Sequence, residues 1–242
     1  MLSSDSISLN EGEGGFTKHI IIRRERVVSV KKLGLMFIGT ILLLILSGCR
    51  QPETYDEILE IYDRIADNEG VIESLEEQRL ELVEREKVLG RRIIAGGADD
   101  NALVFHYLEE VLEAIEKREE VIEEQLQVMR QSMEELELAA GLIQEIENRQ
   151  IREEFLQVQE LHQERYEAFA RLSYSYLETA SRETRLYTML QGEEQNLQDL
   201  ESLIMLLNQR AITDSQLKEE LQLVSGRLND AINELARALE RL

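Results

Sequence analysis

The chain has 242 residues, of which 43% are hydrophobic and 31% are charged. That hydrophobic share is sufficient for a core, while a single proline, 13 glycines and the lack of tryptophan are typical of a chain of long helices. The formal net charge is −22, and because residues 1–48 carry +2, the remainder carries −24. Such an acidic surface repels nucleic-acid phosphates, so we exclude a DNA- or RNA-binding protein.

The first 26 residues do not resemble an export signal. They form a polar leader that includes Asp5, Glu11 and Glu13. We therefore expect residues 1–26 to be a non-native N-terminal extension, with translation starting within 27–30.

Residues 27–48 have the organisation of a secretory signal peptide. Lys31 and Lys32 precede Leu33–Leu46, a stretch of 14 residues without a charged side chain. Fourteen helical residues rise only about 21 Å, less than the hydrocarbon core of a bilayer, so a permanent membrane span is disfavoured. The excess of lysine and arginine before this stretch predicts that the C-terminal part lies outside the cytoplasm.

Cys49 follows this segment directly, and it is the only cysteine, so an internal disulfide is excluded. The sequence Leu46-Ser47-Gly48-Cys49 resembles the lipobox of bacterial lipoproteins. The resemblance implies signal-peptidase recognition of Leu46, Ser47 and Gly48, cleavage before Cys49, and attachment of diacylglycerol to its thiol. Two acyl chains hold a protein stably on a membrane, whereas one holds it only marginally. An uncleaved anchor with an ordinary cysteine is the alternative.

Residues 49–54 are expected to form a short tether, and residues 55–242 a helical domain. Apolar residues recur there at steps of three and four, as a buried helix stripe requires. The stripes run from Ile58 to Ile93, Val104 to Ile143, Phe155 to Leu190 and Leu197 to Leu242. The breaks are predicted at Gly96-Gly97 with Asp99–Asn101, at Asn148–Gln150 and at Gln191-Gly192.

These stripes predict an all-α fold, an elongated antiparallel up-and-down bundle of four long helices. A three-helix, spectrin-like arrangement is the alternative if the turn near Asn148 does not form. In the fourth stripe, the spacing of the apolar residues shifts out of phase at Thr213–Ser215, which indicates a kink or an extra turn there. Asn68, Arg79 and Glu86 interrupt the first stripe; they either fix the register or, as we expect, tilt towards water.

The sequence contains no recognisable catalytic or metal-binding motif. Neither His106 nor His162 lies in a ligand pattern, and His162, on an apolar stripe, is expected to be a core histidine. Paired glutamates are so abundant that they indicate solvent-exposed helix faces and not a specific site. We therefore expect a protein that is not an enzyme and uses no cofactor.

Two groups of side chains are candidates for contact with a wall polymer. Arg85, Lys87, Arg91 and Arg92 lie near the end of the first predicted helix, where cations also complement the helix dipole. The third helix gathers tyrosines and phenylalanines, whose helical spacing favours core packing. Of these, Tyr174 is expected to be exposed and is the second candidate.

The exported region resembles the YkyA-type lipoprotein family of Gram-positive bacteria. The stretches that carry the resemblance are 115–124 (IEKREEVIEE), 165–169 (RYEAF) and 185–190 (RLYTML). It implies an all-helical bundle on the outer face of the cytoplasmic membrane, towards the cell wall, with a wall-binding role. The chain is more acidic than this resemblance leads us to expect, which argues against direct attachment to anionic polymers unless cations bridge them.

Two functions follow as hypotheses. The first is a lipid-anchored protein that contacts peptidoglycan or another wall polymer, or acts as a spacer in the cell envelope. The second is a scaffold that holds another envelope protein or a second copy of itself.

Overall fold

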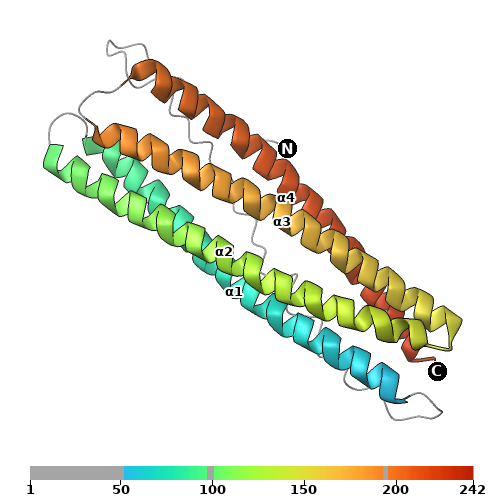
Figure 1. Ribbon diagram of the computed structural model, residues 1–242. Helices are drawn as coiled ribbons and strands as arrows, with labels where there is room; N and C mark the ends of the chain where they lie inside the picture. Colours follow the sequence, from blue (N-terminus) through green and yellow to red (C-terminus); the bar gives the residue numbers. More distant parts are fainter. Residues whose placement is uncertain (1–51, 97–100, 193–195, 242) are drawn as a thin grey trace, which may run out of the picture. The chain divides into compact units, whose positions relative to one another are not determined.

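The computed structural model describes residues 52–96, 101–192 and 196–241. They form four helices, α1 (Pro52–Gly96), α2 (Asn101–Glu145), α3 (Arg149–Gln191) and α4 (Leu197–Leu239), and contain no strand (Figure 1). Consecutive helices run antiparallel, with α1 packed on α2, α2 on α3, and α3 on α4. The all-α up-and-down bundle is thereby confirmed, with four helices in preference to three. The predicted extension, signal peptide and Cys49 lie outside the described residues, and α1 is already helical from Pro52.

The turn near Asn148 exists because that residue caps α3. Its side-chain carbonyl accepts hydrogen bonds from the backbone N–H groups of Gln150 and Ile151, at 3.1 and 3.3 Å. Asn196 caps α4 in the same way. Each cap satisfies N–H groups that a helix start leaves without a partner.

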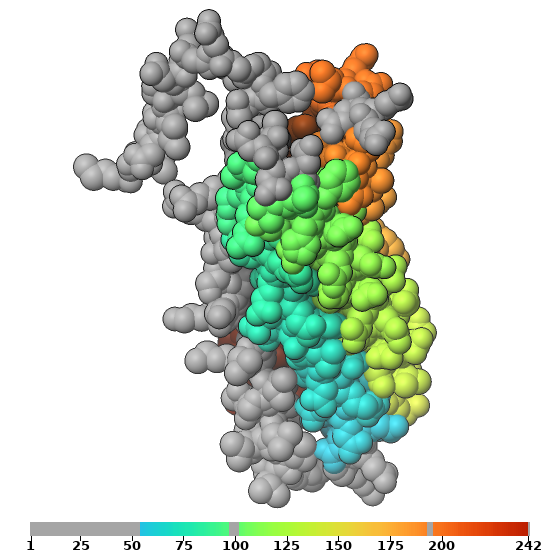
Figure 2. Space-filling model, turned by 90° about the vertical axis from the view of Figure 1, so that its left-hand side faces the viewer, coloured from blue at the N-terminus to red at the C-terminus, as the bar shows by residue number. Residues whose placement is uncertain are grey.

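The predicted break at Gly96 also coincides with a helix end. A Cβ atom built on Gly96 would lie 2.9 Å from Cγ2 of Val104, so a larger residue here would require the Val104 side chain or the two helix ends to shift. Away from this turn, the bodies of α1 and α2 lie side by side (Figure 2).

At the end of the bundle that holds the start of α1, called here the Pro52 end, all four helices share one apolar core. Phe155 is fully buried at its centre, stacked between Tyr55 and Tyr62 with ring centroids 6.4 and 6.2 Å away. Ile58 of α1, Ile143 of α2 and Leu235 of α4 belong to the same cluster. Apolar burial of this extent is the main term that stabilises a helical bundle.

The opposite end, called the Gly96 end, has a smaller core. Its cluster consists of Leu89, Val111, Ile115 and Ala180, with Ile93, Tyr107 and Tyr187 packed against it. These residues belong to α1, α2 and α3, so among the described residues α4 contributes nothing to this cluster. At this end α4 is joined to the bundle through α3.

Helix α4 is unbroken through Thr213–Ser215, so the extra turn that the phase slip left open does not form. The slip has a different cause. Asp214 turns towards α3, where its carboxylate accepts hydrogen bonds from the hydroxyls of Ser175 and Thr179. A polar contact replaces an apolar one at this level, and the helix continues.

Candidate functional site

The two histidines in the described residues have different surroundings. His106 is exposed, with Nε2 3.8 Å from a carboxylate oxygen of Glu110. His162 is buried, as expected, and stacks on Tyr62 and Tyr166 at centroid distances of 5.7 and 6.0 Å. Burial lowers the pKa of His162 to about 4, because the charged ring is desolvated and the Arg165 guanidinium is near. In the described part of the chain, no group of three or more histidine, cysteine or acidic side chains is placed to hold a metal ion.

The four basic candidates lie on α1 within three turns of Gly96. The guanidinium of Arg91 is 3.6 Å from Glu84, and the Lys87 ammonium is 3.9 Å from the same carboxylate. Arg92 lies over the Tyr107 ring, 5.5 Å from its centroid. The last turn of α1 contains no basic residue, so the helix dipole, which acts within that turn, does not account for them.

Tyr174 is 58% exposed, which confirms the expected exposure. It stands on α3, whereas the four basic candidates stand on α1. The remaining aromatic side chains of α3 pack into the two cores or against them, as their spacing predicted. These residues are Phe155, Tyr166, Phe169, Tyr176 and Tyr187.

Exposed apolar side chains accompany the basic ones at the Gly96 end, and sequence reasoning missed them. They are Ile94 of α1 and Leu103 and Phe105 of α2. Phe105 is 48% exposed and directly follows Val104, a position of the apolar stripe. Its place beside the stripe was the sequence signal that indicates its exposure. Together with Arg91, Arg92 and His106 they make up the Gly96-end patch, a set of solvent-accessible cations, rings and aliphatic groups.

Below this patch, a buried ion cluster joins three helices. The Arg118 Nε of α2 lies 3.0 Å from Oε1 of Glu86 of α1, and a terminal nitrogen of the same guanidinium binds Glu183 of α3. Two carboxylates therefore share one arginine. Desolvation, with repulsion from Glu183, raises the pKa of Glu86 to about 8 despite the attraction of Arg118.

The expectation that Arg79 and Glu86 tilt towards water is wrong. Their exposed fractions are 5% and 7%. Arg79 donates two hydrogen bonds of 2.7 Å to Glu76, and its guanidinium lies 4.3 Å from the centre of the Tyr176 ring. Arg79 stays inside because Glu76, one turn away, compensates its charge. Glu86, in contrast, lies beside Arg118, and its raised pKa reduces the cost of burying it. Asn68 is half-buried.

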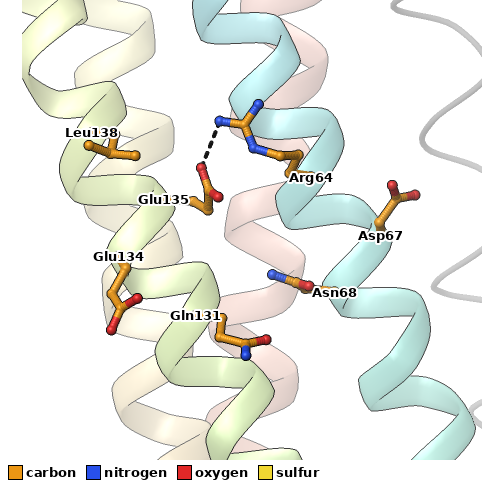
Figure 3. Close-up of a pocket in the computed structure, with 7 residues that line it drawn as sticks. All are labelled: Arg64, Asp67, Asn68, Gln131, Glu134, Glu135 and Leu138. Carbon is orange, nitrogen blue, oxygen red and sulfur yellow. Dashed lines mark hydrogen bonds and ion pairs between the residues drawn. The ribbon is translucent and has the colours of Figure 1, made fainter.

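A shallow groove of about 430 Å³ runs between α1 and α2 (Figure 3). Arg64 bridges it, with an ion pair of 2.8 Å to Glu135, while Asp67 and Glu134 point away from each other. The other lining residues are Asn68, Gln131 and Leu138. Among these residues, no nucleophile is paired with a base, and the open polar lining differs from the apolar pockets that hold small ligands.

No helix in the described ranges is apolar over a length that would cross a bilayer.

Comparisons with known proteins agree with this fold. Residues 53–238 match the model of the YkyA family, which is described as "Putative cell-wall binding lipoprotein". The chain is also similar to the uncharacterized lipoprotein YkyA of Bacillus subtilis (strain 168), with 23% identity over 199 residues, 82% of this chain and 86% of that protein.

A crystal structure at 1.6 Å of a conserved protein of unknown function from Staphylococcus aureus has the same fold. The TM-score is 0.55 at 19% identity, covering 78% of this chain and 95% of the other. Because the family match spans nearly the whole helical region, the chain belongs to the YkyA family of lipoproteins.

Proposed function

We propose that this chain is a lipid-anchored protein of the cell envelope, held on the outer face of the cytoplasmic membrane through diacylglycerol on Cys49. The lipobox-like sequence after an uncharged stretch of 14 residues supports the anchor, as does membership of a lipoprotein family. Only Arg50 and Gln51 separate Cys49 from the start of α1 at Pro52. A link this short holds the Pro52 end close to the lipid surface.

Replacement of the thiol tests the anchor. Cys49→Ser removes the acceptor of the lipid, so the variant is expected to leave the membrane fraction or to accumulate as an unprocessed precursor. Fractionation of cells and mass measurement of the full chain check this. A Cys49→Ser variant that is processed and stays membrane-bound like the wild type would contradict the proposed anchor.

We further propose that the Gly96-end patch contacts a wall polymer, in a binding role and not a catalytic one. The observation that carries this proposal is that exposed arginines and exposed apolar side chains occur together at the Gly96 end; the Pro52 end also exposes arginines, among them Arg149 and Arg237. Each helix is about 65 Å long at 1.5 Å per residue, so a bundle standing on its Pro52 end would present the patch well above the lipid surface. Arginines recognise anionic groups, and ring faces such as Phe105 stack on sugars.

Retention of the full lipoprotein on purified sacculi, with and without Mg²⁺, tests wall contact. Arg91→Glu with Arg92→Glu is expected to reduce retention strongly, because it places two repelling charges in the patch. The matched control is Arg149→Glu with Arg237→Glu, the same charge change on exposed side chains at the Pro52 end, which is expected to bind like the wild type. Equal losses in both pairs, or no retention of the wild type, would overturn the proposal.

A scaffold for proteins is the second candidate, and a specific observation favours it. Helix α4 exposes large apolar side chains, including Met205, Ile212 and Leu223, that a spacer does not require. Crosslinking in cells followed by mass spectrometry separates the two functions: a single dominant protein partner favours the scaffold, whereas diffuse wall material favours the binder.

A further inference from the structure

The part of α4 that lies outside the four-helix core has an exposed face without charge. Met205 is 65% exposed and Ile212 54%, and Leu206 lies beside them. Between Glu201, which is exposed one turn before Met205, and Glu219, their neighbours on this side of the helix are uncharged as well. The residues of this surface, called the α4 outer face, are Ser202, Met205, Leu206, Asn208, Gln209, Ile212, Thr213, Ser215 and Gln216.

The spacing of these residues is that of a coiled-coil seam. Met205, Gln209, Ile212 and Gln216 follow one another at steps of four, three and four, which places them on one line along the helix. Ser202 begins the same line three residues before Met205, and the other four positions flank it. Two charged residues in 202–218 have partners on α3 and do not belong to this face. Arg210 binds Glu178, and Asp214 accepts hydrogen bonds from Ser175 and Thr179.

The exposed side of α2 shows what a solvated helix face looks like in this chain. It carries exposed acidic side chains in both halves of the helix, among them Glu116, Glu120, Glu123, Glu134 and Glu137. With −24 on residues 49–242, two copies repel each other through such faces. The α4 outer face is where they can meet without opposing carboxylates.

We propose that the α4 outer face pairs with the same face of a second copy, as a parallel two-helix seam. The parallel direction rests on the proposed function, since two copies anchored by Cys49 in one membrane point the same way. In that arrangement Met205 and Ile212 each pack against their counterparts. Gln209 and Gln216 meet their own counterparts and fix the register, as a polar residue in a seam does.

The extent of the seam predicts where pairing takes place. The outer face spans 15 residues, about 22 Å of helix, and is bounded by the exposed Glu201 before it and by Glu219 and Glu220 after it. Such a short contact is weak between freely diffusing molecules. Two copies confined to one membrane in the same orientation meet at a much higher effective concentration, which makes a weak contact sufficient.

Disulfide trapping of the full chain in cells tests the pairing. Met205→Cys places a thiol on the seam, where the parallel arrangement brings it next to its counterpart within bonding distance. Mild oxidation is expected to shift this variant to twice the monomer mass. The control is Glu124→Cys, at an exposed position of α2, which is expected to remain at the wild-type background. Adding Ile212→Glu to Met205→Cys should abolish the shift, because two carboxylates then face each other.

Each outcome bears on the proposal. A dimer band with Met205→Cys and none with Glu124→Cys supports it. Membrane-bound Met205→Cys and Ile212→Cys chains that both stay monomeric would overturn the pairing and leave the anchor intact. A band that contains a different protein would overturn the second copy as the occupant. Chains missing from the membrane fraction would overturn the anchor and, with it, parallel pairing.

Discussion

The two ends of the bundle are built from similar helices but are held together differently. At the Pro52 end, four helices enclose one apolar core around Phe155. At the Gly96 end, three helices enclose a small cluster around Leu89, with the Arg118–Glu86–Glu183 ions directly below it. Buried ions add little net stability, since desolvation offsets their attraction, whereas apolar burial adds directly to it.

The two ends therefore differ in what they contribute: one stabilises the fold, and the other offers surfaces for contact. The Pro52 end concentrates the burial that stabilises the fold, while the Gly96 end and the α4 outer face leave cations and apolar groups in solvent. In the proposed arrangement, a protein held at the membrane by its Pro52 end needs its contact surfaces at the other end and along its sides.

Removing the central ring should distinguish the two cores most clearly. Phe155→Ala is expected to lower the free energy of unfolding by about 3–5 kcal/mol, and Leu89→Ala by about 2 kcal/mol, because the thinner Gly96 end relaxes around the gap more easily. Urea denaturation of the full chain measures both. If Leu89→Ala destabilises the protein as much as Phe155→Ala, the ends do not differ as proposed.

Acid should weaken the Pro52 end through His162. Its pKa of about 4 in the folded state lies below the unfolded value of 6.5, so its contribution is present above pH 6.5 and lost as pH falls towards 4. The expected loss is on the order of 3 kcal/mol. Denaturation at several pH values checks this, with His162→Phe as the variant that should lack this component. An unchanged pH dependence in His162→Phe would refute it.

The Gly96 end should respond in the opposite direction through Glu86. Its folded-state pKa of about 8 exceeds the ordinary value of 4.5, so its contribution is present below pH 4.5 and lost as pH rises through 8. Glu86→Gln is therefore expected to be more stable than the wild type at pH 9, by roughly 1–2 kcal/mol. Melting curves of the two proteins at pH 5 and pH 9 test the sign. A variant less stable at pH 9 would show that the ion pair outweighs its desolvation.

The N-caps of α3 and α4 are both asparagines, so removing each one compares the two ends with the same chemical change. The expected effects on stability are the smallest of those given. Asn148→Ala at the Pro52 end is expected to cost about 1 kcal/mol of global stability. Asn196→Ala removes the same hydrogen bonds from the start of α4 but is expected to cost less, because that segment can fray without opening the four-helix core. Equal losses in chemical denaturation would indicate that the start of α4 unfolds together with the rest.

The sequence was sufficient to predict the helices, because long periodic stripes and capping residues are local signals. The breaks at Gly96 and Asn148 and the exposure of Tyr174 are confirmed. The burial of Glu86 was not predictable, since its partner Arg118 lies on another helix and sequence spacing does not reveal such a pair. The phase slip at Asp214 likewise required the hydroxyls of α3 for its explanation.

The candidate contact surfaces were only partly predictable. Basic residues near the end of α1 are visible in the sequence, but the exposure of Phe105 and the α4 outer face is not, because an apolar residue carries the same signal whether or not a neighbouring helix covers it. The roles of Arg85, Lys87, Arg91, Arg92 and Tyr174 in wall contact remain predictions.

Amide hydrogen exchange along the full chain tests the central contrast most directly. Amides of residues 58–72, 122–143, 151–166 and 228–235 should exchange only through global unfolding, since they surround the four-helix core. Amides of residues 197–218, in the part of α4 outside that core, should exchange first by local opening. Uniform protection along α4, or faster exchange at the Pro52 end than at the Gly96 end, would contradict this account.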